Sequence, residues 1–462
     1  MKLLYLCYFI SSFLPLVDVY SLAPSYLYLS VVVIIYTMIL ILNGNYSIIN
    51  PISFISLYIY ISLTIGDIII GQNLIEVENL SAEILRNEIV GKNTVIKIYM
   101  ILMWIFNITN MLDQKQYKYL AVINKDKSDA RNAIFKSPIL VLPIILAPFL
   151  FMNVHIDTIF YRGYVSHYIA IYMCYALLLA CGMSSRKYII IMIVCLIFMT
   201  LKFYGDRREI IYFVYGAFSL YIIRHKPARS FFIKIIVTLP FVISLTLMAT
   251  ILRGEINIIE LLADPNKFYS IIRAYLEYEN FLFFLAVNSD AANFYIHGIK
   301  SMQILLSDTD KILFGSTYLK TLFMIFPREL IPDLKPSSMM TIYTTITDPV
   351  YREGGNSYPI NFIAEAVWNF YIFSPIFIYY LGCLMNKLYK KLIMNFQNLN
   401  TYTIILIFAI ISPILSFVRG SGIEYVVYST LFFLIILLIH QVQNAILIGA
   451  SKKSDRIKEK CP

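Results

Sequence analysis

The chain has 462 residues, of which 59% are apolar and only 14% are charged, and its mean hydropathy is +0.72. A soluble globular protein carries about a quarter charged residues and less than half apolar ones. This composition therefore excludes a soluble enzyme, a secreted disulfide scaffold and a disordered chain. About twelve apolar runs of roughly 20 residues, the length that crosses a bilayer, account for the excess of apolar residues. We predict a polytopic, all-α membrane protein.

The predicted spans follow one another closely along the chain, with a single long interruption. The first span, preceded by Lys2, is interpreted as a signal anchor and not as a cleaved signal peptide, because further spans follow it directly. In chain order the predicted spans cover residues 3–17, 25–42, 47–71, 95–112, 138–153, 164–183, 187–203, 209–223, 231–252, 359–385, 401–418 and 424–446.

Lys and Arg residues in the connecting loops predict the orientation of the spans. Short cytoplasmic loops are enriched in these residues. Alternate connections of this chain, above all 113–137 and the basic tail 447–462, carry most of them. Both termini are therefore predicted to be cytoplasmic. The formal net charge of +10 is explained largely by this orientation signal, and nucleic acid is not an expected partner.

The long connection, residues 253–358, is predicted to be external. It separates nine transmembrane helices in residues 1–252 from three more in 359–446. Two of its rather apolar pieces, 268–288 and 311–326, are expected to lie along the membrane surface as amphipathic helices, with a re-entrant arrangement as the alternative. A half-apolar segment of this length on the outer face is expected to cap a lipid-linked substrate.

The external face is predicted to carry many arginine side chains, although the orientation rule disfavours them there. Guanidinium groups bind phosphate in a bidentate way and stay charged when partly desolvated, so a cluster of them would suit a lipid diphosphate. The alternative is that each arginine pairs with a carboxylate beside it in the sequence. The external arginines are Arg162, Arg207, Arg208, Arg253, Arg273, Arg328, Arg352 and Arg419.

Two adjoining motifs mark the start of the tenth span. The sequence REGGNS at 352–357 precedes Pro359, and Ser followed by Pro is typical of a helix start, whose N-terminus would face an anion. Within the span, Glu365 is a carboxylate at a depth where insertion costs about 2.5–3.5 kcal/mol, so it is expected to have a partner or a task. It is interpreted either as a general base or, preferably, as the group that holds an arginine in place. Asn361, Trp368 and Asn369 are predicted to share its helix face.

The remaining chemistry-bearing residues indicate less. The histidines are interpreted as packing residues, although His297 in the external segment keeps a catalytic role open. No HExxH, P-loop, GxSxG or c-type haem motif is present, so neither ATP hydrolysis nor metalloprotease chemistry is expected, and no metal or other cofactor is predicted. The six cysteines show no CxxC pairing and are expected to be free thiols.

Two stretches of the sequence, FGSTYLKTLFMIFPRELIPDLKP at 314–336 and REGGNSYPINFIAEAVWNF at 352–370, resemble the C-terminal signature of Wzy-type O-antigen polysaccharide polymerases. That family shows a similar G-x-x-Y-L run, a Pro-Arg with prolines downstream, a glycine-rich stretch and an A-E-A helix. The GDRRE sequence at 205–209 and Leu-Arg-Gly at 252–254 match in position and style. Where the family often has Asn-Phe-Gly, this chain has Asn369-Phe370-Tyr371.

The resemblance implies a GT-C-like, metal-independent glycosyltransferase in the bacterial cytoplasmic (inner) membrane, with its active site facing the periplasm. Such enzymes transfer a growing glycan en bloc from undecaprenyl diphosphate onto a newly flipped lipid-linked repeat unit. The implied partners are this lipid-linked glycan, membrane lipid, a chain-length regulator protein and a flippase. The reaction needs cations that stabilise the leaving diphosphate, and a base or oriented acceptor that activates the attacking hydroxyl.

Candidate site residues follow from these two needs and from the stacking of sugars on aromatic rings. The diphosphate is assigned to Arg207, Arg208, Arg253, Arg328 and Arg352, of which Arg328 and Arg352 are also counted as catalytic. Glu353 or Glu365 is expected to be the base or orienting group, with Asp206 and Glu209 as lesser candidates. Tyr343, Tyr358 and Trp368 are assigned to the glycan, with anchoring at the membrane interface as the alternative.

Two other functions stay open at this stage. An O-antigen or teichoic-type ligase would use the same lipid-diphosphate donors but a different acceptor, and an external catalytic histidine would favour it. A lipid-linked oligosaccharide flippase would perform no chemistry and should show a polar central cavity along many helices. The scarcity of charges within the predicted spans, notably Asp67 and Glu365, argues against the flippase.

Overall fold

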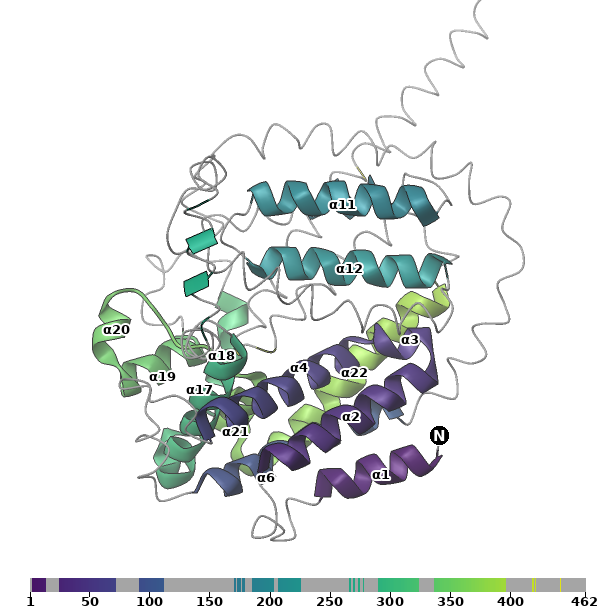
Figure 1. Ribbon diagram of the computed structural model, residues 1–462. Coiled ribbons are helices and arrows are strands. Elements are labelled where there is room, and N and C mark those ends of the chain that lie inside the picture. Colours follow the sequence, from purple (N-terminus) through teal and green to yellow (C-terminus); the bar gives the residue numbers. More distant parts are fainter. Residues whose placement is uncertain are drawn as a thin grey trace, which may run out of the picture.

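The structure is a computed structural model that describes residues 2–13, 25–71, 91–111, 185–202, 207–225, 290–323 and 336–395, with isolated positions at 170–178, at 266–277, and at 418, 420 and 441. These residues form helices and turns, and no strand occurs among them (Figure 1). Three helical stretches are long and apolar enough to cross a membrane, namely Tyr26–Asn43, Pro51–Ile69 and Phe362–Lys390. The described part of the chain therefore confirms a helical protein with candidate membrane spans.

Several predicted spans coincide with helices to within a few residues. These helices are α1 (Lys2–Phe13), α2 (Ser25–Asn43), α4 (Pro51–Gly66), α6 (Lys92–Met111), α11 (Ser185–Lys202) and α12 (Arg207–His225). The predicted spans 138–153 and 231–252 lie outside the described residues, and 164–183, 401–418 and 424–446 lie mostly outside them. Four cysteines within the described residues, Cys7, Cys174, Cys195 and Cys383, are free thiols, as expected.

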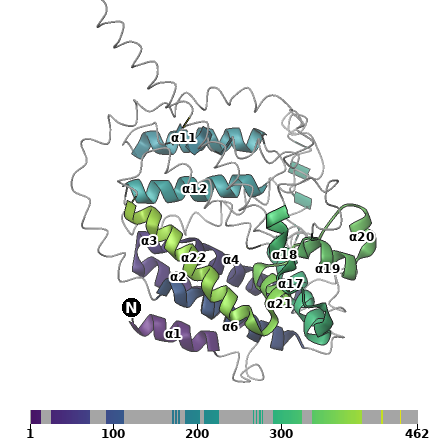
Figure 2. The ribbon, with the colours of Figure 1, turned by 180° about the vertical axis from the view of Figure 1, so that it is seen from behind.

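Helix α4 lies at the centre of the main bundle and packs against α2, α6, α17 and α22 (Figures 1 and 2). A short helix, α3 (Asn45–Ile48), leads into it. Asn50 begins α4 because its side chain accepts a hydrogen bond from the backbone N–H of Ile52, and Pro51 occupies the first turn, where no partner for its nitrogen is needed. The helix continues into a π-helical segment, Asp67–Gly71.

The tenth predicted span, 359–385, is two helices and not one. Helix α21 (Phe362–Phe370) and helix α22 (Ser374–Asn395) are separated by a 3-10 turn at Tyr371–Phe373. The span also begins later than predicted, since Asn361, and not Ser357 ahead of Pro359, caps α21 by accepting from the N–H of Ala364. The break follows from the backbone of Tyr371, whose φ of +44° cannot continue a right-handed helix.

The long segment before α21 contains α17 (Asp290–Ser307), α18 (Ser316–Leu319), α19 (Met339–Thr347) and α20 (Pro349–Glu353). Helix α17, which was not predicted as a helix, packs against α4, α6 and α21, and its residues 294–299 are all buried. Helices α19 and α20 project from the same end of the bundle (Figures 1 and 2).

The prediction of one amphipathic helix over 311–326 was wrong. The described part of this range begins at the end of a 3-10 turn at Thr309–Lys311 and contains α18 and a second 3-10 turn at Lys320–Phe323. Phe314 and Gly315 interrupt the helix because both have positive φ values, +47° and +83°. The predicted helix over 268–288 is described only at scattered positions, of which 269–270 and 273–274 are helical and exposed.

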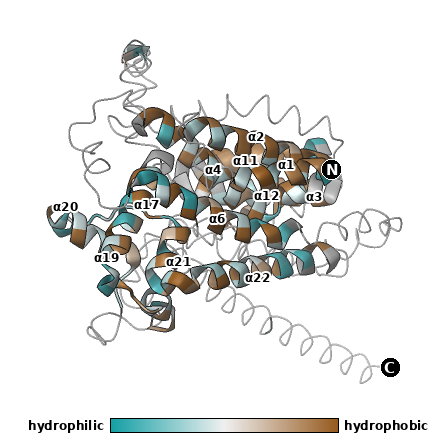
Figure 3. Ribbon diagram, turned by 90° about the horizontal axis from the view of Figure 1, so that it is seen from below, coloured by the Kyte–Doolittle hydropathy of each residue, from teal (hydrophilic) through white to brown (hydrophobic). Residues whose placement is uncertain are grey.

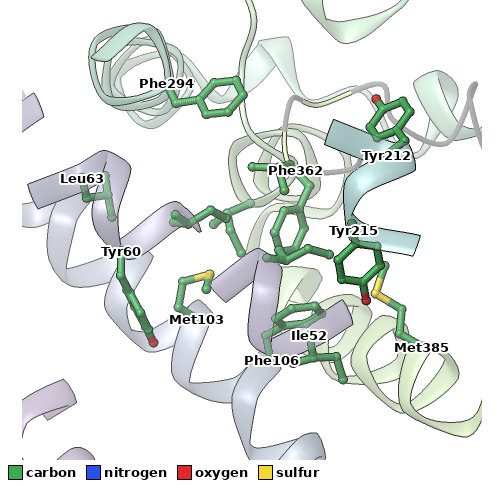
Figure 4. Close-up of a cluster of buried hydrophobic side chains, with 14 of the residues drawn as sticks. Ile52, Tyr60, Leu63, Met103, Phe106, Tyr212, Tyr215, Phe294, Phe362 and Met385 are labelled. Carbon is green, nitrogen blue, oxygen red and sulfur yellow. The ribbon is translucent and has the colours of Figure 1, made fainter. Parts of the chain in front are cut away.

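The interior of the bundle combines apolar packing with a hydrogen-bonded polar network. Figure 4 shows Ile52, Phe106, Tyr215, Phe362 and Met385 gathered from four helices and the start of α21. Side-chain hydrogen bonds join buried polar residues of α2, α6 and α22 to residues of α4 and to Asn50 at its start. These residues are Tyr36, Asn50, Ser53, Ser56, Asn107, Asn110 and Asn386.

The outer faces of α2 and α11 are mostly apolar, in contrast to the polar network inside the bundle. Apart from Arg186 and Lys187 at the start of α11, their exposed side chains are large and apolar, among them Val31, Ile34, Met38, Ile190, Val194 and Ile197. Figure 3 shows the ribbon coloured by hydropathy. Polar groups inside and apolar groups outside are the arrangement expected for helices in lipid.

Candidate functional site

A cluster of polar side chains lies where α21 meets α18 and the loop before it. Asn361 fixes the start of α21, and this places Glu365 in the first turn and Asn369 one turn later on the same face. Glu365 is only 1% exposed and Asn369 only 1%, although both lie in a candidate membrane span. A carboxylate in such surroundings needs hydrogen-bond partners, because burial of an unpaired charge is costly.

Thr317 supplies one of these partners from a distant part of the sequence. Its hydroxyl donates to Oε1 of Glu365 at 3.1 Å and accepts from Nδ2 of Asn369 at 2.8 Å. Its backbone N–H donates to Oδ1 of Asn369 at 3.4 Å. The backbone N–H of Leu313 also donates to the carbonyl of Trp368 at 2.8 Å. The loop before α18 is thus bonded to α21 through the backbone of Leu313, and α18 itself through Thr317. We call Thr317, Glu365 and Asn369 the Thr-Glu-Asn cluster.

Helix α17 holds the other side of α21. The indole N–H of Trp368 donates to the carbonyl of Ser301 at 2.9 Å. The hydroxyl of Tyr99 on α6 donates to Oδ1 of Asn361 at 2.9 Å. Gly298 permits this approach, because a Cβ there would lie 2.7 Å from Nδ2 of Asn361 and 2.8 Å from the Tyr99 hydroxyl. The start of α21 is therefore packed and capped. The expectation that its N-terminus faces an anion stays a prediction.

A second set of aromatic and polar groups lies between α17, α19 and α20. His297 is buried and forms a 3.0 Å hydrogen bond through Nδ1 with the hydroxyl of Tyr343. Its ring stacks on Tyr358, with centroids 4.0 Å apart. The Tyr358 hydroxyl donates to Oδ2 of Asp348 at 2.7 Å. Nε2 of His297 is buried and has no hydrogen-bond partner among the residues that the structure describes.

The electrostatics of this set follow from burial and from short hydrogen bonds. Burial, together with the positive charge of Lys300, lowers the pKa of His297 to about 3, so its imidazole is neutral at physiological pH. The backbone N–H of Tyr351 and the hydroxyl of Tyr358 lower the pKa of Asp348, which keeps that carboxyl ionised. Burial, and then the neighbouring Asp348, raises the pKa of Tyr358.

Arg352 lies in the last turn of α20, and Gly354 and Gly355 end that helix; they do not start α21. Its guanidinium donates from Nη1 to the carbonyls of Gly355 and Asn356, at 3.4 and 3.1 Å. Within the described residues it forms no ion pair, so the alternative of pairing with the adjacent Glu353 was wrong. A guanidinium has five N–H donors. The two bonds from Nη1 hold Arg352 in place, and within the described part of the chain the donors on Nε and Nη2 have no hydrogen-bond partner. Glu353 is exposed.

The other predicted site residues are distributed unevenly. The first turn of α12 is formed by Arg207, Arg208 and Glu209, whose side chains lie outside the described part of the chain. Three more candidates lie outside it entirely, namely Asp206, Arg253 and Arg328. Tyr343 and Trp368 are fully buried, and neither ring face is open, so their assignment to the glycan rests on the sequence alone. The arginine predicted to accompany Glu365 likewise stays a prediction.

Sequence reasoning missed an ion pair between α6 and the π-helical segment that follows α4. Asp67, fully buried, lies 3.0 Å from Nζ of Lys92 and accepts from the Tyr295 hydroxyl on α17 at 2.7 Å. Gly66 lets Tyr295 approach, since a Cβ there would lie 2.3 Å from its ring. The signal available in the sequence was the single carboxylate within the predicted span 47–71.

Among the residues that the structure describes, no three His, Cys, Asp or Glu side chains come together as they would around a metal ion. Comparison of the chain with protein-family models gives no match. Neither the curated proteins nor the solved structures contain a match to it.

Proposed function

We propose that the protein is a membrane glycosyltransferase that polymerises undecaprenyl-diphosphate-linked oligosaccharide repeat units into a surface polysaccharide. The observation that carries this proposal is the Thr-Glu-Asn cluster. Thr317 lies in the first of the two sequence stretches that resemble the polymerase family, and Glu365 and Asn369 lie in the second. Almost fifty residues separate them, yet they share hydrogen bonds in a buried position. Residues that carry the resemblance thus belong to one site.

The backbone of Tyr371 supports the same proposal. It stands where the family often has a glycine after Asn-Phe, and its φ is +44°. Residues other than glycine rarely adopt this region, because the Cβ atom clashes with the backbone. At this position the chain thus has a tyrosine in a backbone conformation that a glycine adopts more easily, and a glycine is what the family often has there.

In the proposed reaction a hydroxyl of the acceptor repeat unit attacks the anomeric carbon of the donor glycan. The hydroxyl proton passes to a carboxylate, and the bond from the anomeric carbon to undecaprenyl diphosphate breaks. Arg352 is the proposed diphosphate ligand, because its guanidinium is held by two carbonyls and keeps further donors. The exposed Glu353 beside it is the proposed base, and Glu365 is the proposed orienting group for the segment around Thr317.

The competing functions receive less support. His297 is the histidine that a ligase reading requires, but a base with a pKa of about 3 is weak at neutral pH. A flippase should expose polar groups along a central path. The buried polar side chains of α2, α4 and α6 instead bond to one another, as Tyr36 and Ser56 do with Asn107.

The finer topology belongs to the same proposal. It comprises about twelve spans in a GT-C-like arrangement, both termini in the cytoplasm, and residues 253–358 on the periplasmic face of the bacterial inner membrane. Proposed partners are the lipid-linked glycan, a chain-length regulator and a flippase. The diphosphate ligands proposed beyond Arg352 are Arg207, Arg208, Arg253 and Arg328.

The proposal is tested in cells that lack the protein and are complemented with variants. Loss of the protein should leave glycan of single-repeat length, and the wild-type gene should restore long polymer. Arg352→Ala should lower the rate of polymerisation about 10²- to 10³-fold, as expected for removal of one charge-stabilising donor. Val350→Ser, on the same short helix and 76% exposed, is the matched control and should restore polymer.

Membrane insertion of each variant is measured by cell fractionation. Normal polymer length with Arg352→Ala would remove Arg352 from the site. Loss of all surface glycan, single repeats included, in cells without the protein would favour a ligase or a flippase over a polymerase.

A further inference from the structure

Three aromatic rings form a stack that runs from the interior of α17 to the surface of α20. The innermost ring is His297, the middle ring is Tyr358, and the outer ring is Tyr351. The centroids of Tyr351 and Tyr358 are 4.6 Å apart, and their planes differ by only 15°. Tyr351 is 40% exposed, whereas His297 is 6% exposed. The stack therefore ends at the surface in one aromatic ring that is backed by two others.

Stacking on Tyr358 and a hydrogen bond from its own backbone N–H hold Tyr351 in position. Asp348 accepts the backbone N–H of Tyr351 through Oδ1 at 3.0 Å and the hydroxyl of Tyr358 through Oδ2 at 2.7 Å. The backbone N–H of Tyr358 donates to the hydroxyl of Thr344 on α19 at 2.8 Å. One carboxylate thus fixes both tyrosines. A ring that is already ordered loses little conformational freedom when a ligand covers it.

Polar groups that suit a sugar lie beside this ring. Arg352 is the next residue, and its guanidinium is anchored by the carbonyls of Gly355 and Asn356 with donors left over. Glu353 on the same short helix is exposed. A pyranose presents an apolar C–H face, which packs on an aromatic ring, and equatorial hydroxyls, which bond to carboxylate and guanidinium groups.

We propose that Tyr351 is the surface on which a pyranose ring of the lipid-linked glycan stacks, next to the diphosphate bound by Arg352. This inference rests on the proposed function and assigns the glycan contact to a residue that sequence reasoning did not select. Tyr343 and Trp368, selected from the sequence, are fully buried. The alternative role of an exposed tyrosine is to anchor α20 in the membrane interface.

The test measures binding of two lipids to the full-length protein in nanodiscs. One is undecaprenyl diphosphate, and the other is the same lipid carrying the repeat unit, extracted from cells that lack the protein. Tyr351→Leu, which keeps an apolar side chain, should weaken binding of the glycan-bearing lipid about three- to tenfold, the range expected for loss of one aromatic contact. Binding of undecaprenyl diphosphate should change less than about twofold. Tyr351→Phe should bind both lipids as the wild type does.

Val350→Ser controls for membrane anchoring, because it removes an apolar side chain that is 76% exposed on the same helix. Equal weakening of both lipids by Tyr351→Leu, or no weakening of either, would overturn the inference. Glycan binding by Val350→Ser that falls as much as that of Tyr351→Leu would also overturn it. If the wild type binds the glycan-bearing lipid more tightly through Tyr351 but forms no polymer from it, the proposed function fails while the sugar contact stands.

Discussion

Removal of the Thr317 hydroxyl should release α18 and the loop before it from α21. In Thr317→Val the shape of the side chain is kept, but a bond to the Glu365 carboxylate and a bond from the Asn369 amide are lost. A hydrogen bond to a charged group contributes about 1.5–3 kcal/mol and a neutral one about 1 kcal/mol. The expected loss is therefore about 2–4 kcal/mol, or roughly thirtyfold to several hundredfold in the population of the undocked loop.

Amide hydrogen exchange of peptides from residues 312–323, followed by mass spectrometry on the detergent-solubilised protein, measures this population. Exchange of the amides of Leu313 and Thr317, which are bonded to α21, should accelerate by that factor. Thr317→Ser keeps the hydroxyl and should exchange as the wild type does. Thr345→Val is the matched control, because within the described residues the Thr345 hydroxyl bonds only the carbonyl of Thr341, on the exposed face of α19. Unchanged exchange in Thr317→Val would refute the view that this hydroxyl joins the two segments.

Two further predictions concern His297 and Tyr371. The pKa of His297 falls from 6.5 to about 3 on folding. The unfolded chain therefore binds a proton more readily below about pH 6.5, and acidification destabilises the folded state. The free energy of unfolding should fall by at most about 2 kcal/mol between pH 6.5 and 5. Unfolding midpoints in detergent should fall over this range more in the wild type than in His297→Gln, and equal falls would contradict the assignment. The backbone of Tyr371 has a φ of +44°. Tyr371→Gly should therefore be more stable than Tyr371→Ala by about 1 kcal/mol in the free energy of unfolding, and it should unfold at a higher temperature. Within helices the alanine variant is the more stable of the two. That order at position 371 would show that the backbone there does not have the positive φ.

Apolar runs predicted the helices well wherever the run was uninterrupted. Helices α2 and α6 begin and end within a few residues of the predicted spans, because an apolar run long enough for a bilayer needs no knowledge of its neighbours. Helix α17 was missed, since His297, Lys300 and Gln303 interrupt its apolar residues. Its place against α4 depends on Gly66 and on the Asp67–Tyr295 hydrogen bond, and neither is visible in a hydropathy pattern.

The sequence predicted which residue types belong to the site, but it did not predict which of them are in contact. The sequence identified Glu365 as a carboxylate within a span that needs a partner or a task, and the structure places Thr317 against it as a partner. No periodicity connects residues so far apart, because the link is made by the turn at Phe314 and Gly315. The break at Tyr371 was also not predicted, since hydropathy along a continuous apolar run does not distinguish one helix from two.

The most direct test of the central claim is a polymerisation assay with the purified protein in liposomes. The substrate is the undecaprenyl-diphosphate-linked repeat unit extracted from cells that lack the protein, and the products are separated by size. We expect the wild type to convert single repeats into a ladder of multiples, and Arg352→Ala to leave them single. Repeats that stay single with correctly folded wild-type protein, whether or not the lipid crosses the bilayer, would contradict the proposal that this protein is a polymerase.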